Sequence, residues 1–384
     1  MRFQLVLGTS VGAIHACYVA ATADGSAERG THLGKIWRSF RLDEMLPLSP
    51  ADLLRVPRRL LGLRRVSSEL RAGRLPQRLY GALDTAALER VVVREIPWDR
   101  IQRNVAAGAL DALCVTATRI GTGHAVVFVE SRDGRPPRWT RDRTVVAVPA
   151  RLRPQHALAS AAIPLLFPAV RIGRSYYADG GLRLNTPLSP ALRLGADRVL
   201  VIALRTSALE TTGGDLPGDP GVAAYGSPAY LFGKVLNALL LDHVDTDLAQ
   251  MHLMNEILRD GERAFGPQFL DRINAVAERE RGLRFRRVED LVLRPSRDLG
   301  VLAGEVLERK RRAGGLSPIL RFFLGAASAG GGTSFEADLL SYLLFDHEFT
   351  DPVVELGYAD AKAREEDLAR FFEDAPLEER ALAG

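Results

Sequence analysis

A GxSxG motif near the start of the chain has the residue types and spacing of a nucleophile site. It reads Gly8-Thr9-Ser10-Val11-Gly12, after a short apolar run that ends at Leu7 and before a stretch of helical composition from Val11 to Ala23. A serine at a strand-to-helix turn is typical of a nucleophile elbow, which projects the hydroxyl above a sheet. The backbone N–H of Val11 begins the helix and is one expected donor to a developing oxyanion. We therefore predict Ser10 as a nucleophile.

A serine hydroxyl needs a base within hydrogen-bond reach before it can attack an ester. The first candidate is Asp179, which ends a predicted strand and precedes Gly180 and Gly181. A turn aspartate that bonds its own backbone is the other interpretation of this segment. The second candidate is a histidine, because Ser10, Asp179 and then His243 or His347 follow the chain order of an α/β-hydrolase triad. Both histidines lie in stretches of helical pattern, and these residues alone leave the base open.

Strand-like and helical segments alternate over the first 205 residues. Expected strands cover residues 1–7, 110–118, 125–130, 145–148, 170–178 and 198–204, and expected helices cover 11–23, 32–40, 85–94, 98–107, 155–162 and 187–194. This alternation predicts an α/β domain with buried parallel strands. Residues 206–228 are rich in Gly, Pro and Asp and are expected to be a linker. Residues 229–384 are expected to be mainly helical, with one strand near residues 291–293.

Composition excludes several classes of protein. The chain has 384 residues and a net charge of +4, with arginine spread along its length, which does not indicate a nucleic-acid footprint. Cys17 and Cys114 lack metal-ligand spacing and are expected to be buried thiols. No apolar run reaches about 18 residues, and the first apolar run is too short for a secretory signal. We expect a cytoplasmic protein that needs no metal or cofactor and that contacts membranes peripherally.

The segment from His156 to Pro187 resembles the second half of a patatin-like phospholipase domain. The matching residues are His156, Ala159-Ser160-Ala161-Ala162-Ile163-Pro164, Phe167-Pro168, Tyr177-Ala178-Asp179-Gly180-Gly181 and Asn185-Thr186-Pro187. With residues 8–12 they look like that family's nucleophile motif followed by its Asp-Gly-Gly/Ala motif. The resemblance covers residues 1–205. It implies a three-layer α/β/α domain with a mostly parallel central sheet.

The same resemblance implies the chemistry of a lipid acyl hydrolase. In that family a Ser and Asp dyad works without histidine, so Ser10 carries over as nucleophile and Asp179 as general base. The implied substrates are fatty-acyl esters such as phospholipids, cleaved through an acyl-serine intermediate. Lipid access through amphipathic helices is expected, and one candidate is the apolar stripe of Leu231, Phe232, Val235, Leu236, Leu239 and Leu240, for which core packing is the other interpretation.

One family feature is not found before Ser10. Members begin with a strand and a glycine-rich loop of the type GGGxRG, whose backbone N–H groups form most of the oxyanion hole. We therefore expect an N-terminally truncated chain with impaired activity, because losing one oxyanion donor costs about 2.7 to 4 kcal/mol in the transition state. The alternative function is a non-catalytic lipid-binding or interaction remnant.

Three further residues of the matching segment are expected to have structural roles. Asn185 and Thr186 are expected to cap the helix that starts near Pro187. His156 precedes a short helix, and we expect it to have a packing or capping role, with polarisation of a nearby carbonyl group as the other interpretation.

Overall fold

The central sheet is built around one long strand. The computed structural model describes residues 3–25, 28–41, 75–79, 81, 83, 85–134, 144–206, 244–281, 284–313 and 344–373. The six-stranded sheet consists of β1 (Leu5–Thr9), β2 (Ala112–Arg119), β3 (Ala125–Ser131), β4 (Val145–Pro149), β5 (Val170–Ile172) and β6 (Ser175–Asp179). The pairs β1–β2 and β3–β4 are parallel, and the pairs β2–β3, β2–β6 and β5–β6 are antiparallel.

Strands β1 and β6 share one edge of β2. Strand β3 pairs with residues 112–118 of β2 and so occupies the opposite edge. On the shared edge, Thr9 is the last β1 residue in register and lies opposite Thr116, while Asp179 of β6 lies opposite Ala117. Because β1 and β6 run toward each other, their carboxyl ends meet at neighbouring positions of β2.

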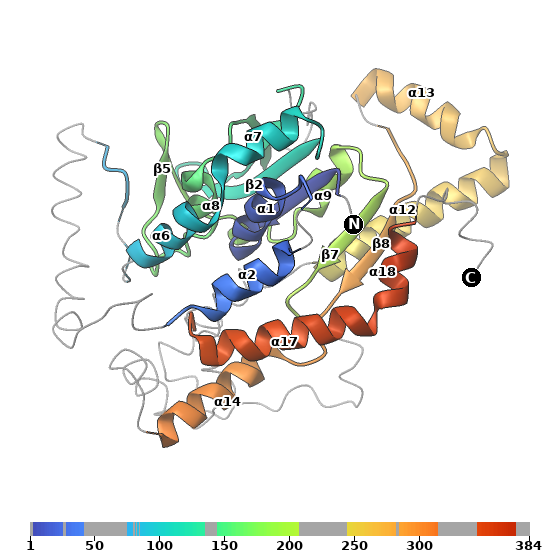
Figure 1. The fold of residues 1–384 in the computed structure, drawn as a ribbon. Helices are drawn as coiled ribbons and strands as arrows, with labels where there is room; N and C mark the ends of the chain where they lie inside the picture. The colour runs from blue at the N-terminus through green and yellow to red at the C-terminus, as the bar shows by residue number, and fades with distance from the viewer. Residues whose placement is uncertain are drawn as a thin grey trace, which may run out of the picture.

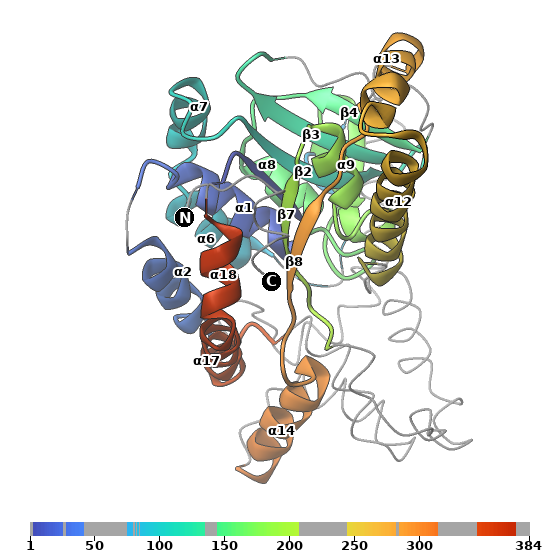
Figure 2. The same cartoon turned by 90° about the vertical axis from the view of Figure 1, so that its right-hand side faces the viewer.

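Helices cover both faces of the sheet, which gives three layers (Figures 1 and 2). On one face lie α1 (Val11–Ala21), α7 (Trp98–Ala106) and α8 (Pro154–Ser160), with α6 (Ala86–Glu95) and α2 (Arg29–Arg38) outside them. Leu113, Val115 and Ala117 of β2 join the main core on this face. Ala112 and Cys114 point to the other face, near α9 (Leu188–Arg193), as the alternation of a strand requires.

A second, two-stranded sheet joins distant parts of the chain. Strand β7 (Arg198–Ile202) pairs in parallel with β8 (Glu289–Leu293), and α12 (Val244–Phe265) packs against β7 and α9 through Leu248 and Met251. Helix α13 (Phe269–Arg281) follows α12, and α14 (Leu299–Arg312) follows β8. The described residues after position 243 are therefore mainly helical, with one strand at residues 289–293, as expected.

The last two helices of the described residues pack on earlier parts of the chain. Helix α17 (His347–Ala363) packs on α2, where the Thr350 hydroxyl donates to the Trp37 carbonyl at 2.9 Å. Helix α18 (Glu365–Phe371) packs on β8 through Leu368 and Phe371. The predicted α/β class with a helical C-terminal region is confirmed. The domain boundaries stay a prediction, and the expected linker lies, apart from Thr206, outside the described residues.

One expected strand is a hairpin instead. Residues 170–178 were predicted as a single strand, but β5 and β6 form an antiparallel pair joined by Gly173 and Arg174. Gly173 has φ of +60°, which a two-residue hairpin turn of this kind needs at its first position. The prediction was wrong because it treated Gly173 and Arg174 as strand residues, although a glycine followed by a polar residue is a common two-residue hairpin turn.

Candidate active site

The chain around Ser10 forms a strained turn between β1 and α1. Ser10 has φ of 55° and ψ of −129°, a conformation that residues with a side chain rarely adopt. Backbone strain of this kind is concentrated at functional sites. The Ser10 carbonyl accepts from the Ala13 N–H at 2.9 Å, which starts the helix. A Cβ on Gly8 would lie 2.1 Å from the Gly12 carbonyl oxygen, whereas a Cβ on Gly12 would meet nothing within 4 Å. Gly8 is therefore required by the turn, and Gly12 is not.

The sheet register brings Ser10 against Asp179. Ser10 directly follows the end of β1, and Asp179 ends β6 at the neighbouring position of β2. The Ser10 Oγ donates a hydrogen bond to Asp179 Oδ2 at 2.6 Å. Two residues that are 169 positions apart in the sequence are thus held in direct contact by the backbone of three strands.

Backbone groups fix the Asp179 carboxyl group from the other side. Asp179 is 0% exposed, and its Oδ1 accepts from the Gly181 N–H at 2.7 Å at the start of the short 3₁₀ helix η1 (Gly180–Leu182). The Asp179 N–H donates to the Ala162 carbonyl at 2.8 Å, and its carbonyl accepts from the Thr118 hydroxyl at 2.8 Å. The residue is therefore both a turn aspartate that bonds its own backbone and the partner of Ser10.

Burial makes this carboxylate more basic than an exposed one. Loss of hydration raises the pKa of Asp179 to about 6, against the smaller lowering by hydrogen bonds from Ser10 and Gly181. At neutral pH the group is ionised and can accept a proton. A pKa near the working pH is suited to general-base chemistry.

Gly180 allows the two strand ends to approach. A Cβ on Gly180 would lie 2.3 Å from the Thr116 carbonyl oxygen and 2.8 Å from the Thr9 side chain. The Thr9 hydroxyl donates to the Leu184 carbonyl at 3.0 Å, which ties the end of β1 to the chain after η1. Any larger residue at position 180 would push β6 away from β1.

Backbone donors stand at the start of α1. The N–H groups of Val11 and Gly12 have no acceptor inside the helix, as at every helix N-terminus, and none outside it in the part of the chain that the structure describes. Val11 is 37% exposed, so this end of the helix is open to solvent. These two donors can face an anionic oxygen bonded to the Ser10 side chain.

The histidines weighed as alternatives have other surroundings. His156 Nδ1 accepts from the Arg153 N–H at 3.0 Å and caps α8, and burial lowers the pKa of His156 to about 4. His347 begins α17, where its N–H donates to the Phe40 carbonyl and its Nδ1 lies 3.6 Å from Asp346 Oδ1. His243 lies outside the described residues. Among the residues that the structure describes, the Ser10 hydroxyl bonds to Asp179 and to no histidine ring.

Other expected residues are also located. Cys17 and Cys114 are free and buried, as predicted, and burial raises the pKa of Cys114 to about 12. The N-cap of α9 is Pro187, which has no capping side chain, and the Leu188 N–H donates to the carbonyl of Thr186 instead. The apolar stripe expected at residues 231–240 lies outside the described residues.

Ser160 is a site residue to which the sequence assigned no role. It ends α8, is 0% exposed, accepts from the Ser10 N–H at 2.8 Å and donates to the Thr116 carbonyl at 2.5 Å. Its signal in the sequence is weak: a single hydroxyl in a helix of small residues, inside the segment that carries the family resemblance. Only the fold shows that this hydroxyl reaches the turn after β1 and the backbone of β2.

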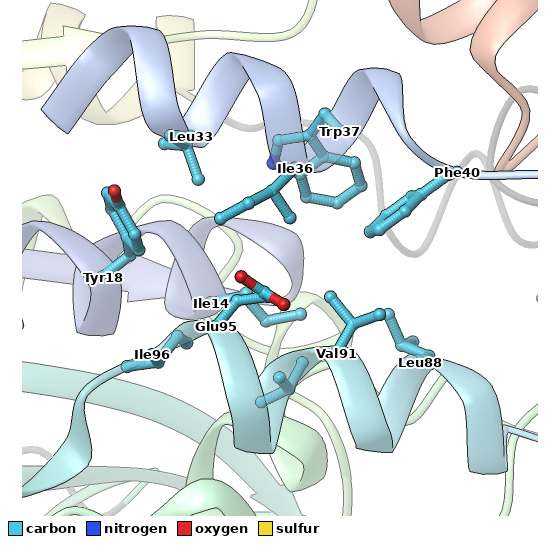
Figure 3. Close-up of a pocket in the computed structure, with 11 residues that line it drawn as sticks. Ile14, Tyr18, Leu33, Ile36, Trp37, Phe40, Leu88, Val91, Glu95 and Ile96 are labelled. Carbon is cyan, nitrogen blue, oxygen red and sulfur yellow. The ribbon is translucent and has the colours of Figure 1, made fainter. Parts of the chain in front are cut away.

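An apolar pocket lies beside α1, outside the Ser10 and Asp179 site (Figure 3). Helices α1, α2 and α6 line it, with Ile14 and Trp37 among the apolar residues and Glu95 as a charged one. The Tyr18 hydroxyl, also in its lining, bonds His32 Nδ1 at 2.8 Å. Across the described ranges, no group of acidic, histidine or cysteine side chains could hold a metal ion, and no helix could cross a membrane.

Comparison with known proteins identifies the family. The model of the family described as patatin-like phospholipase matches residues 1–192, half of the chain. The chain belongs to the patatin-like phospholipase family. A "cGAMP-activated phospholipase" of Pseudomonas aeruginosa is 31% identical over 113 residues, a match that spans 29% of this chain and 31% of that protein.

A solved structure was also found by shape. It is VipD from Legionella pneumophila, 13% identical, with 90% of this chain and 86% of that chain covered at a TM-score of 0.23. A score this low does not define a shared fold.

Proposed function

We propose that this protein is a lipid acyl hydrolase in which Ser10 and Asp179 form a catalytic dyad. The observation that carries the proposal is the 2.6 Å hydrogen bond from Ser10 Oγ to the buried Asp179 carboxylate, made at a strained turn before a helix N-terminus. Membership of the patatin-like phospholipase family supports a lipid substrate.

In the proposed reaction, Ser10 Oγ attacks the carbonyl carbon of a fatty-acyl ester while Asp179 Oδ2 takes the hydroxyl proton. The carbonyl oxygen becomes an oxyanion that faces the N–H groups of Val11 and Gly12. Collapse of this intermediate breaks the ester C–O bond, and Asp179 returns the proton to the leaving alcohol. Water then attacks the acyl-serine with Asp179 again as base, which releases the fatty acid and restores Ser10.

A carboxylate can fill the role that histidine has in a triad because its two oxygens have separate partners. The Gly181 N–H holds Oδ1, and so orients the group, while Oδ2 faces Ser10. Burial brings the pKa of Asp179 to about 6, within the usual range of an imidazole. The Gly181 N–H therefore orients the Asp179 carboxylate, and burial makes it more basic.

Turnover of p-nitrophenyl esters of graded chain length and of phospholipid vesicles tests this proposal. Ser10→Ala and Asp179→Asn are expected to lower kcat at least about 1,000-fold, as losses of triad members do. His347→Ala is the control, and it is expected to keep the activity of the parent. Turnover that persists without the Ser10 hydroxyl, or that is lost in His347→Ala, overturns the proposed dyad. Vesicle binding without any Ser10-dependent hydrolysis overturns the enzymatic function itself.

A further inference from the structure

The end of α8 holds the backbone of both dyad residues. The Ser160 hydroxyl accepts from the Ser10 N–H at 2.8 Å, and the Ala162 carbonyl accepts from the Asp179 N–H at 2.8 Å. These two contacts are made from positions only two residues apart. The segment from Ser160 to Ala162 therefore sets the spacing between the end of β1 and the end of β6.

The Ser160 hydroxyl replaces a sheet hydrogen bond where β1 leaves the sheet. The last residues in register are Thr9 and Thr116. Beyond them the chain turns at Ser10, so its N–H cannot continue an ordinary ladder. The hydroxyl stands between this N–H and the Thr116 carbonyl, to which it donates at 2.5 Å. One buried hydroxyl thus satisfies a donor of the elbow and an acceptor of β2.

This link matters because the Ser10 conformation is strained. A strained backbone persists only where the surrounding structure fixes it. Gly8 supplies the steric room for the turn, whereas Ser160 supplies a directional bond that holds the Ser10 peptide plane. The position of the Ser10 Oγ relative to Asp179 Oδ2 depends on that plane.

We propose that Ser160 is a positioning residue that fixes the Ser10 elbow so that its hydroxyl stays hydrogen-bonded to Asp179. The proposal rests on the proposed function, and it adds a third side chain to the dyad without giving that side chain a proton-transfer step. Ser160 itself is bonded on both sides and fully buried, so it does not touch the substrate.

Ser160→Ala is expected to lower kcat about 100-fold, the loss that a displacement of about 1 Å causes at a reacting group, with KM changed less than about threefold. Its second effect is on pH dependence. The hydrogen bond from Ser10 lowers the pKa of Asp179, so weakening this bond moves the acid limb of the kcat profile to higher pH. A purely structural role would lower the melting temperature without moving that limb.

The matched control is Thr22→Val. Thr22 lies just after the far end of α1, is also buried, and its hydroxyl donates to the Tyr18 carbonyl at 2.8 Å. This variant loses one buried hydroxyl hydrogen bond at the far end of α1, away from the dyad. It is expected to melt at a lower temperature and to keep the kcat and the pH midpoint of the parent.

The measurement is the pH profile of kcat and KM for a short-chain p-nitrophenyl ester, at a temperature where each variant is folded by circular dichroism. If Ser160→Ala does not fold, Ser160→Cys decides by the same criteria, because a thiol fills the space but bonds only weakly. Unchanged kcat and midpoint in the folded variant overturn the role of Ser160 and leave the dyad standing. Absence of Ser10-dependent turnover in the parent chain overturns both.

Discussion

Replacing Asp179 with asparagine is expected to stabilise the protein at neutral pH while it removes activity. Burial raises the pKa of the Asp179 carboxyl group from 3.8 to about 6, although hydrogen bonds from Ser10 and Gly181 lower it. A carboxyl group that binds its proton more tightly in the folded state makes folding less favourable as pH rises between the unfolded and folded pKa values. Its contribution to stability is therefore greatest below about pH 4 and lost above about pH 6.

The size of the effect follows from the shift. One pKa unit corresponds to about 1.36 kcal/mol, so ionising Asp179 in the folded protein costs about 3 kcal/mol in total. About 2 kcal/mol of this falls between pH 4.5 and 7.5, a range in which the folded carboxyl group loses its proton. Asparagine has a similar shape and does not titrate. The free energy of unfolding of Asp179→Asn, relative to the parent, is therefore expected to rise by about 2 kcal/mol across this range.

Urea unfolding followed by circular dichroism at several pH values measures this difference. Because both proteins share every other titrating group, only the change at position 179 contributes to the pH dependence of the difference. A difference that stays constant between pH 4.5 and 7.5, or that falls with rising pH, contradicts the account of a buried carboxylate kept for catalysis at the expense of stability. Ester hydrolysis by the Asp179→Asn samples is expected to be at least about 1,000-fold slower than that of the parent at neutral pH.

Three other predictions concern the turn and the base. Gly8→Ala is expected to lower the free energy of unfolding by at least about 1 to 3 kcal/mol, because its Cβ would overlap the Gly12 carbonyl. Gly12→Ala has free space for its Cβ and is expected to be neutral or to stabilise α1 by up to about 1 kcal/mol. Equal urea midpoints for the two variants contradict this difference. Gly180→Ala is expected to lower kcat about 100-fold, because its Cβ would push the end of β6 away from the Thr116 carbonyl. A parent-like kcat in a steady-state ester assay would show that the close packing of Gly180 on Thr116 is not needed for activity. Activity of the parent is expected to fall on acidification with a midpoint near pH 6, because only the ionised Asp179 accepts a proton, and a kcat profile that is flat from pH 5 to 8 argues against this base.

Local features of the site could be predicted from the sequence. A strand-to-helix turn around residues 8–12 and a carboxylate at the end of a strand are short-range patterns, and the structure places both as expected. Their contact is not a local property, because it depends on β1 and β6 meeting on one edge of β2. The family resemblance led to the expectation that these two residues act together, and their catalytic role stays a prediction.

Features that depend on distant contacts were not predictable. The parallel partner of β7 is β8, about 90 residues later, and nothing in the pattern of either strand specifies the other. Ser160 is one hydroxyl among small residues, and its two partners are Ser10, which follows β1, and Thr116 of β2. The hairpin at Gly173 was missed because a single glycine between two short strand-like segments indicates a bulge, a bend or a turn equally well.

The most direct test of the central claim is covalent labelling of the protein with a fluorophosphonate, followed by mass spectrometry of its peptides. The account predicts that the label is found on Ser10 and that Asp179→Asn abolishes labelling, because the hydroxyl is then no longer activated. A label on a different serine, or equal labelling rates for the parent and Asp179→Asn, would contradict the Ser10 and Asp179 dyad.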